Sequence, residues 1–168
     1  MTREQVVAEA RAWIGTPYRL GGRVKGAGAD CSTLLLEVYR ACGFILDDDG
    51  FAFGQDWFLH TSEPEYLKRA LKLARQVSEG ICYRSTVAEP GNLVLSKAVG
   101  SRLHNHGGIV TTWPRLIHAV QPVVEETDIR HALWQNREIV ILDPWKAHED
   151  RVPQSPAPAT QTTGERVG

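Results

Sequence analysis

The stretch WIGTPYRLGG at residues 13–22, followed by GADCS at residues 28–32, is the most informative part of the sequence. Residues 16–29 are rich in glycine and predict a loop. Asp30, at the end of that loop, is a residue type that commonly caps the start of a helix. Cys31 would then lie in the first helical turn, where unpaired amides and the helix dipole favour a thiolate. A cysteine in this position is a candidate nucleophile.

Three helices are predicted in the first half of the chain, where apolar residues recur at helical spacing. Thr2 and Gln5 have the spacing of a capping box at the start of a helix that we expect to run to Ile14. The helix that begins after Asp30 is expected to end at Gly43. A third helix is expected over residues 62–77, since its first residues also have the pattern of a capping box.

Beyond residue 80 the sequence changes to short apolar runs separated by turn residues, which predicts strands. The expected strands cover residues 92–96, 108–112, 116–120, 123–126 and 138–142, with a short helix at 129–134. Helices followed by a run of strands indicate an α+β fold, in which helices pack on an antiparallel sheet. We expect a single domain over residues 1–147 and a flexible tail, rich in Pro, Gln and Thr, over residues 148–168.

Composition and charge exclude several classes of function. The 168 residues carry 19 basic and 20 acidic side chains, so no basic field indicates a nucleic-acid partner. No apolar stretch is long enough to insert in a membrane. The first residues, MTREQVVAEA, lack the apolar segment of a secretory signal, so we expect the protein to be made in the cytoplasm.

The three cysteines are too few, and odd in number, for a disulfide framework. Cys42 falls late in the helix that Cys31 begins, where the dipole disfavours a thiolate. Cys82 has no setting that would activate it. We expect Cys42 and Cys82 to be small buried apolar side chains, and Cys31 to be the reactive one.

A thiol nucleophile needs a base and a group that orients the base. His106 lies just before the predicted strand at 108–112, and His118 lies in the next predicted strand, which follows a turn at Trp113-Pro114. Whether their rings meet depends on the strand register. His104 and His106 could together ligate a metal, but no matching set of ligands has suitable spacing. We therefore expect no metal and no cofactor, and the letters HNH alone do not indicate a nuclease.

Four motifs in order resemble those of NlpC-type peptidoglycan endopeptidases over about residues 5–126. They are the opening stretch with GADCS, PGNLVL at 90–95, NHGGIV at 105–110 and LIHA at 116–119. The resemblance implies a papain-like α+β fold with Cys31 as nucleophile, His106 as general base and acid, and His118 as the residue that orients His106. Tyr18 matches a tyrosine near the oxyanion position. Asp30 and Ser32 match positions that contact the substrate or shape the site, although helix capping would also explain them.

The resemblance also implies a reaction. The family commonly cuts the stem peptide of peptidoglycan between D-glutamate and a diamino acid, through a thioacyl enzyme. The chain departs from the family pattern at Thr33, Asn92 and Gly107, which bears on substrate preference.

Residues 51–77 resemble the phage-type branch, so we expect phage tail proteins as partners and action in the periplasm or cell wall. Two alternatives stay open: a structural tail-tip protein that binds peptide without turnover, and acyl transfer from lipid on the same fold.

Overall fold

Six strands form the main sheet of the computed structural model, and all of them pair in antiparallel fashion. The structure describes residues 1–44, 65–81, 86–97, 100–131, 134 and 137–149. The six strands of the main sheet are β3 (Arg75–Ile81), β4 (Leu93–Lys97), β5 (His104–Thr112), β6 (Arg115–Ala119), β7 (Val124–Asp128) and β8 (Glu138–Asp143). They lie in the order β3-β8-β4-β5-β6-β7. A second, two-stranded sheet pairs β1 (Arg23–Val24) with β2 (Gly28–Ala29) in the loop before Cys31.

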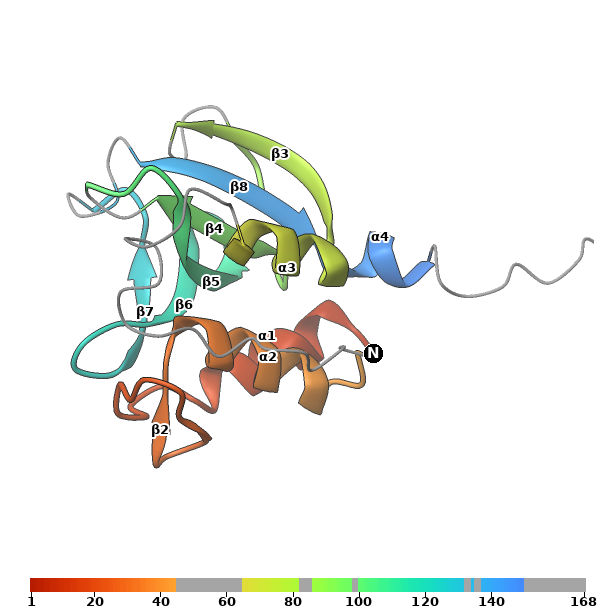
Figure 1. Ribbon diagram of the computed structural model, residues 1–168. Coiled ribbons are helices and arrows are strands. Elements are labelled where there is room, and N and C mark those ends of the chain that lie inside the picture. The colour runs from red at the N-terminus through yellow and green to blue at the C-terminus, as the bar shows by residue number, and fades with distance from the viewer. Residues whose placement is uncertain (45–64, 82–85, 98–99, 132–133, 135–136, 150–168) are drawn as a thin grey trace, which may run out of the picture.

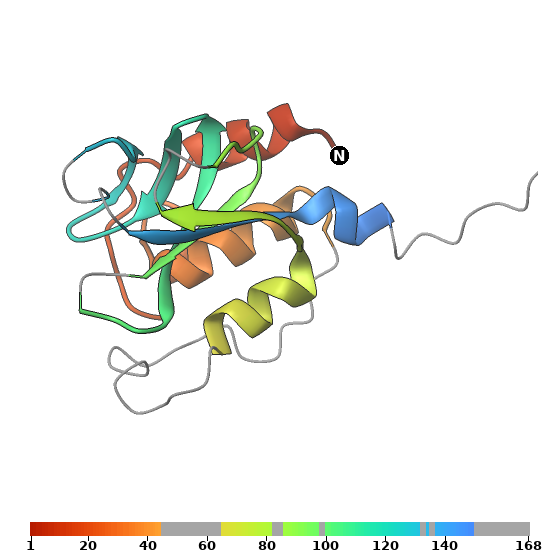
Figure 2. The ribbon, with the colours of Figure 1, turned by 90° about the horizontal axis from the view of Figure 1, so that it is seen from above.

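The helices α1 (Arg3–Arg11) and α2 (Cys31–Ala41) pack against each other and against β5, on one side of the sheet (Figure 1). A third helix, α3 (Glu65–Leu73), contacts β5 and β3, and Figure 2 shows it beside α2. Burial of apolar side chains between these helices and the sheet is the main stabilising term, at roughly 1.5–3 kcal/mol for each large side chain. No helix among the described residues is both long and apolar enough to cross a bilayer.

The alternation of side chains along the strands gives the sheet two buried faces. The face toward the helices buries Leu93, Leu95, Ile109, Ile117, Val140 and Leu142. The opposite face buries Val94, Val110, Leu116, Ile139 and Ile141, together with Ile129 and Trp134 from the connection between β7 and β8. Burial on both faces explains why these strands are continuous apolar runs in the sequence.

Local capping signals were predicted correctly, but the first helix is shorter than expected. Thr2 Oγ1 accepts a hydrogen bond from the Gln5 amide at 3.3 Å, and Gln5 Oε1 accepts one from the Thr2 amide at 2.7 Å. The helix ends at Arg11 rather than at Ile14, because the amides of residues 13 and 14 bond three residues back, in tighter turns. Ile14 is therefore 47% exposed.

The predicted helix over 62–77 is wrong at its C-terminal end. It ends at Leu73, and residues 75–81 form β3, which pairs with β8 from Arg75 to Ile81. Pairing with a distant strand here outweighs the helical periodicity of the local sequence. The start of that predicted helix, residues 62–64, lies outside the described residues.

Two other expectations need correction, and one new helix appears. Residues 129–131 and 134 form turns rather than a helix. Cys42 is partly exposed at the end of α2 rather than buried, and Cys82 lies outside the described residues. The helix α4 (Pro144–Glu149), which was not predicted, follows β8 directly and includes the first two residues assigned to the tail. The rest of that tail, residues 150–168, is not described.

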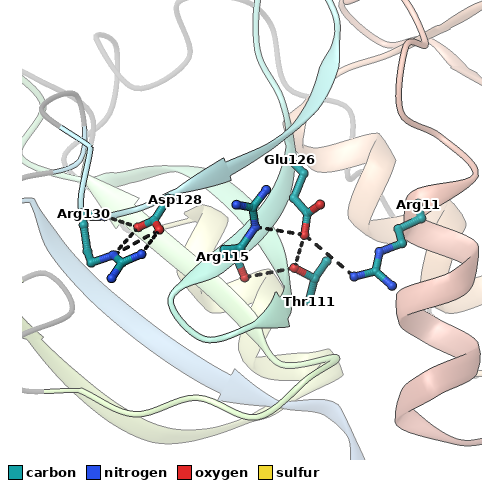
Figure 3. A network of polar contacts seen from close by, with 6 residues as sticks. All are labelled: Arg11, Thr111, Arg115, Glu126, Asp128 and Arg130. Carbon is teal, nitrogen blue, oxygen red and sulfur yellow. Dashed lines mark hydrogen bonds and ion pairs between the residues drawn. The ribbon is translucent and has the colours of Figure 1, made fainter.

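A polar network fixes the edge strand β7 on the sheet and ties it to α1 (Figure 3). Glu126 on β7 accepts a hydrogen bond from the Thr111 hydroxyl on β5 and lies 3.6 Å from Arg115 Nε and 3.9 Å from Arg11 Nη2. Burial would raise the pKa of Glu126, but these hydrogen bonds and positive charges together lower it. The carboxylate is thus held ionised beside β6, the strand that carries His118.

Candidate active site

The buried carboxylate of Asp30 determines where α2 begins. Its Oδ1 accepts hydrogen bonds from the Ser32 amide at 2.9 Å, the Thr33 amide at 2.8 Å and the Ser32 hydroxyl at 2.6 Å. Its Oδ2 accepts one from the Gly21 amide at 2.6 Å, which ties the glycine-rich loop to the helix. Asp30 and Ser32 are only 2% and 3% exposed, so the role visible here is capping. Contact of either residue with substrate stays a prediction.

The Cys31 thiol, at the first position of α2, lies against the backbone on both sides of His106. Its Sγ is 3.9 Å from the Asn105 carbonyl oxygen and accepts a hydrogen bond from the Gly107 amide. The structure therefore brings the predicted nucleophile to the strand that carries the predicted base, although 74 residues separate Cys31 from Asn105.

The pKa of the Cys31 thiol is raised to about 12, which reverses the expectation drawn from its place at a helix start. Burial is the largest cause, and the negative charge of Asp30 adds to it. Hydrogen bonds from Tyr66 and from the Gly107 amide act in the opposite direction but do not outweigh burial. The resting thiol is thus protonated, and its proton must leave when it attacks.

Tyr18 is half-buried in the loop before Cys31 and is held there by its backbone. Its amide donates to the Pro122 carbonyl at 2.8 Å, and Tyr18 forms an isolated bridge with Ala29. The pKa of its phenol is raised to about 12 by burial and by the charges of Cys31 and Asp30. The phenol of Tyr18 is therefore protonated near pH 7, and its role as an oxyanion donor stays a prediction.

His106 and His118 meet on one face of the sheet, which settles the question of register. Gly108 pairs with His118, so His106 lies diagonally across from His118 and points the same way. The His106 Nε2 atom is 2.7 Å from His118 Nδ1. Within the described residues, no hydrogen bond joins the Cys31 thiol to the His106 ring.

The hydrogen-bond pattern assigns the protons on the two rings. Because His106 Nε2 bonds to His118, only His106 Nδ1 is left to accept the thiol proton. That requires Nε2 of His106 to carry a proton and donate it to His118 Nδ1. His118 then carries its own proton on Nε2, a buried atom 3.6 Å from Glu125 Oε1. The carboxylate of Glu125 favours a proton at that position and so favours the tautomer in which His106 is a base.

Both imidazoles are neutral near pH 7. The pKa of His106 lies well below 6.5, because of burial first and then of the charges of His118 and Arg137. The pKa of His118 is lowered to about 4 by burial and by Arg137. The site at rest therefore consists of a protonated thiol and two uncharged rings.

Three residues near these groups were not identified from the sequence: Tyr66, Trp134 and Arg137. The Tyr66 hydroxyl on α3 lies 3.3 Å from the Cys31 carbonyl oxygen and also hydrogen bonds to the thiol. The Trp134 ring is 5.6 Å from the His106 ring and 5.4 Å from the His118 ring. Neither tyrosine nor tryptophan belongs to a recognisable motif.

In the sequence, the glycine at position 107 was the one feature that could have indicated the place of Tyr66. A Cβ on Gly107 would lie 2.8 Å from Tyr66 Oη and 2.8 Å from Leu35 Cδ1. The hydroxyl of Tyr66 thus occupies space that a side chain at position 107 would need, which explains the departure from the family pattern.

The sequence pattern of the NlpC/P60 family matches residues 15–143. The chain belongs to the NlpC/P60 family. No curated protein sequence matches it.

Solved structures of this family share the fold, as the resemblance implied. The NlpC/p60 domain of peptidoglycan hydrolase SagA is 22% identical, with a TM-score of 0.55 over 84% of this chain and 98% of that one. An NLP/P60 protein similar to a lipoprotein from Staphylococcus aureus is 22% identical, with a TM-score of 0.58 over 84% of this chain and 41% of that one. A family protein from Bacillus cereus is 15% identical, with a TM-score of 0.61 over 86% and 40%. This chain thus spans about two fifths of the last two proteins, and the predicted α+β papain-like fold is confirmed.

The contact between Tyr66 and position 107 predicts a non-additive pair of substitutions. Gly107→Ala should lower the free energy of unfolding by about 1–3 kcal/mol, because its methyl group would overlap Tyr66 and Leu35. In a Tyr66→Phe background the same change should be less destabilising. Urea denaturation of the four proteins measures this difference.

Gly108→Ala is the control, since a Cβ there would meet Leu116 and Ile117 and not Tyr66. Its effect should be the same in both backgrounds. An equal effect of Gly107→Ala in both backgrounds would show that the Tyr66 hydroxyl does not occupy this space.

The charge of Arg137 predicts a shift in the titration of the histidine pair. In Arg137→Gln the pKa values of His106 and His118 should rise, because a positive charge is removed while burial remains. NMR titration of the ring protons in a Cys31→Ala background measures both. Arg130→Gln is the control, because Arg130 is paired with Asp128 and does not act on either ring. Unchanged values in Arg137→Gln would contradict this.

Proposed function

We propose that the chain is a cysteine endopeptidase that cuts amide bonds in the peptide stems of bacterial cell wall. The observation that supports this most is the convergence of three elements: α2 supplies the Cys31 thiol, β5 supplies His106, and β6 supplies His118 hydrogen bonded to it. Nucleophile, base and orienting group are the parts that acyl transfer through a thiol requires.

The proposed reaction begins with a protonated thiol. Cys31 Sγ attacks the scissile carbonyl carbon while its proton passes to His106 Nδ1, so charge separates only as the new bond forms. His118 Nδ1 accepts a hydrogen bond from the protonated Nε2 of the resulting imidazolium and holds its orientation. The Cys31 amide and the Tyr18 hydroxyl stabilise the oxyanion.

Collapse of the tetrahedral intermediate breaks the carbon–nitrogen bond, and His106 gives its proton to the leaving amine. The acyl group remains on sulfur as a thioester. A water molecule then attacks the thioester carbonyl and passes a proton to His106. The carbon–sulfur bond breaks, His106 returns the proton to sulfur, and the products are a free carboxyl group and the thiol. Before the first step the thiol must leave the Asn105 carbonyl and reach His106.

The scissile bond that we propose lies between D-glutamate and the diamino acid of the stem, on the basis of the resemblance to NlpC-type enzymes. We also propose delivery by a phage tail or tail-like particle, which rests on the phage-type character of residues 51–77. The described part of that stretch, α3, supplies Tyr66 to the site. Peptidoglycan stem peptide and phage tail proteins are thus the proposed partners.

A second function, binding of stem peptide at a tail tip without turnover, is favoured by two observations. The pKa of the Cys31 thiol is raised, and the thiol bonds to backbone rather than to His106 among the described residues. Both observations describe a thiol that is protonated and not bonded to its base. A protein that only binds peptide would keep this arrangement.

Digestion of purified peptidoglycan and defined stem peptides, with products identified by mass spectrometry, separates the two functions. Wild type should release fragments with a new carboxyl terminus at D-glutamate, and Cys31→Ala should lose this activity by several orders of magnitude. Cys42→Ala, the matched control, should keep it. Saturable binding by wild type without any cleavage would favour the tail-tip function instead.

A further inference from the structure

Arg137 carries a charge that nothing in the described structure neutralises. Its guanidinium is partly buried, and its Nε atom is fully buried without a hydrogen-bond partner. No carboxylate lies within 4.0 Å of it among the described residues, in contrast to Arg3, which pairs with Asp143 at 2.9 Å, and to Arg130, which pairs with Asp128. An unpaired cation removed from water is unfavourable unless a ligand compensates it.

The guanidinium lies beside the histidine pair. Its Cζ atom is 4.9 Å from the centre of the Trp134 ring, and the same ring contacts both His106 and His118. The charge of Arg137 lowers the pKa of both histidines, after burial. A substrate whose scissile bond is at His106 would therefore extend near Arg137.

The cation–π contact with Trp134 does not use the terminal N–H donors of Arg137, although its Nε atom is buried. The N–H groups of a guanidinium point outward in its own plane, whereas stacking uses its face. The planar fork of terminal guanidinium donors matches a carboxylate, which it binds through two parallel hydrogen bonds. An amide in the same place offers one acceptor and no negative charge.

We propose that Arg137 binds a free carboxylate of the substrate and so selects stem peptides that are not amidated at that position. This inference rests on the proposed function. Two carboxylates flank the proposed scissile bond: the α-carboxylate of D-glutamate, and a carboxylate of the diamino acid. Each is replaced by a carboxamide in one of two matched peptides, which identifies the one that Arg137 binds.

The test compares the acid peptide with both amidated peptides at about pH 8, where both imidazoles are neutral in every variant. Wild type should show kcat/KM about 10- to 100-fold lower for one of the amides, through KM, because a charged hydrogen-bonded pair is lost. Arg137→Gln should cut the acid peptide and that amide equally well. Arg130→Gln should keep the wild-type preference.

Binding to Cys31→Ala protein, measured by calorimetry, tests the inference apart from turnover. The acid peptide should bind more tightly than one amide, and Arg137→Gln in this background should abolish the difference. If wild type cleaves nothing but this difference is found, the proposed reaction fails and the carboxylate site stands. Equal affinity for acid and amides, unchanged discrimination in Arg137→Gln, or no binding of any peptide would overturn the carboxylate site.

Discussion

The rest of the site depends on the buried carboxylate of Asp30. Four hydrogen bonds to it fix the first turn of α2, where Cys31 lies, and tie Gly21 in the preceding loop to that turn. The same charge also raises the pKa of the thiol that it positions. Burial, with the charge of Asp30 in addition, thus keeps the nucleophile protonated at rest, and a base becomes necessary for the proposed chemistry.

The proposed base, His106, is uncharged at rest, as the thiol is. Burial and the charge of Arg137 keep His106 and His118 neutral, and the bond between the rings leaves one nitrogen of His106 available to accept a proton. A neutral thiol and neutral imidazole need less stabilisation in a buried site than an ion pair would. In the proposed reaction, charge develops only when a carbonyl group is present to receive the sulfur's electrons.

The sequence predicted the features that depend on local physics. Capping by Thr2 and Asp30 needs only residues within one turn, and the strands on both sides of His106 are apolar enough to be recognised alone. The motifs indicated Cys31, His106 and His118, but their meeting depended on the pairing of Gly108 with His118. Features created by distant contacts were missed: β3 forms because β8 pairs with it, and Tyr66 and Arg137 approach the site only through the tertiary fold.

Covalent labelling tests most directly whether Cys31 is the nucleophile and His106 its base. A γ-D-glutamyl peptide in which a chloromethyl ketone replaces the scissile amide would be incubated with wild type and with His106→Ala, and the labelled residue mapped by mass spectrometry. We expect one label, on Cys31, and we expect it to form far more slowly in His106→Ala. The free thiol of Cys42 should stay unlabelled. Labelling of Cys42, or of Cys31 at the same rate without His106, would contradict it.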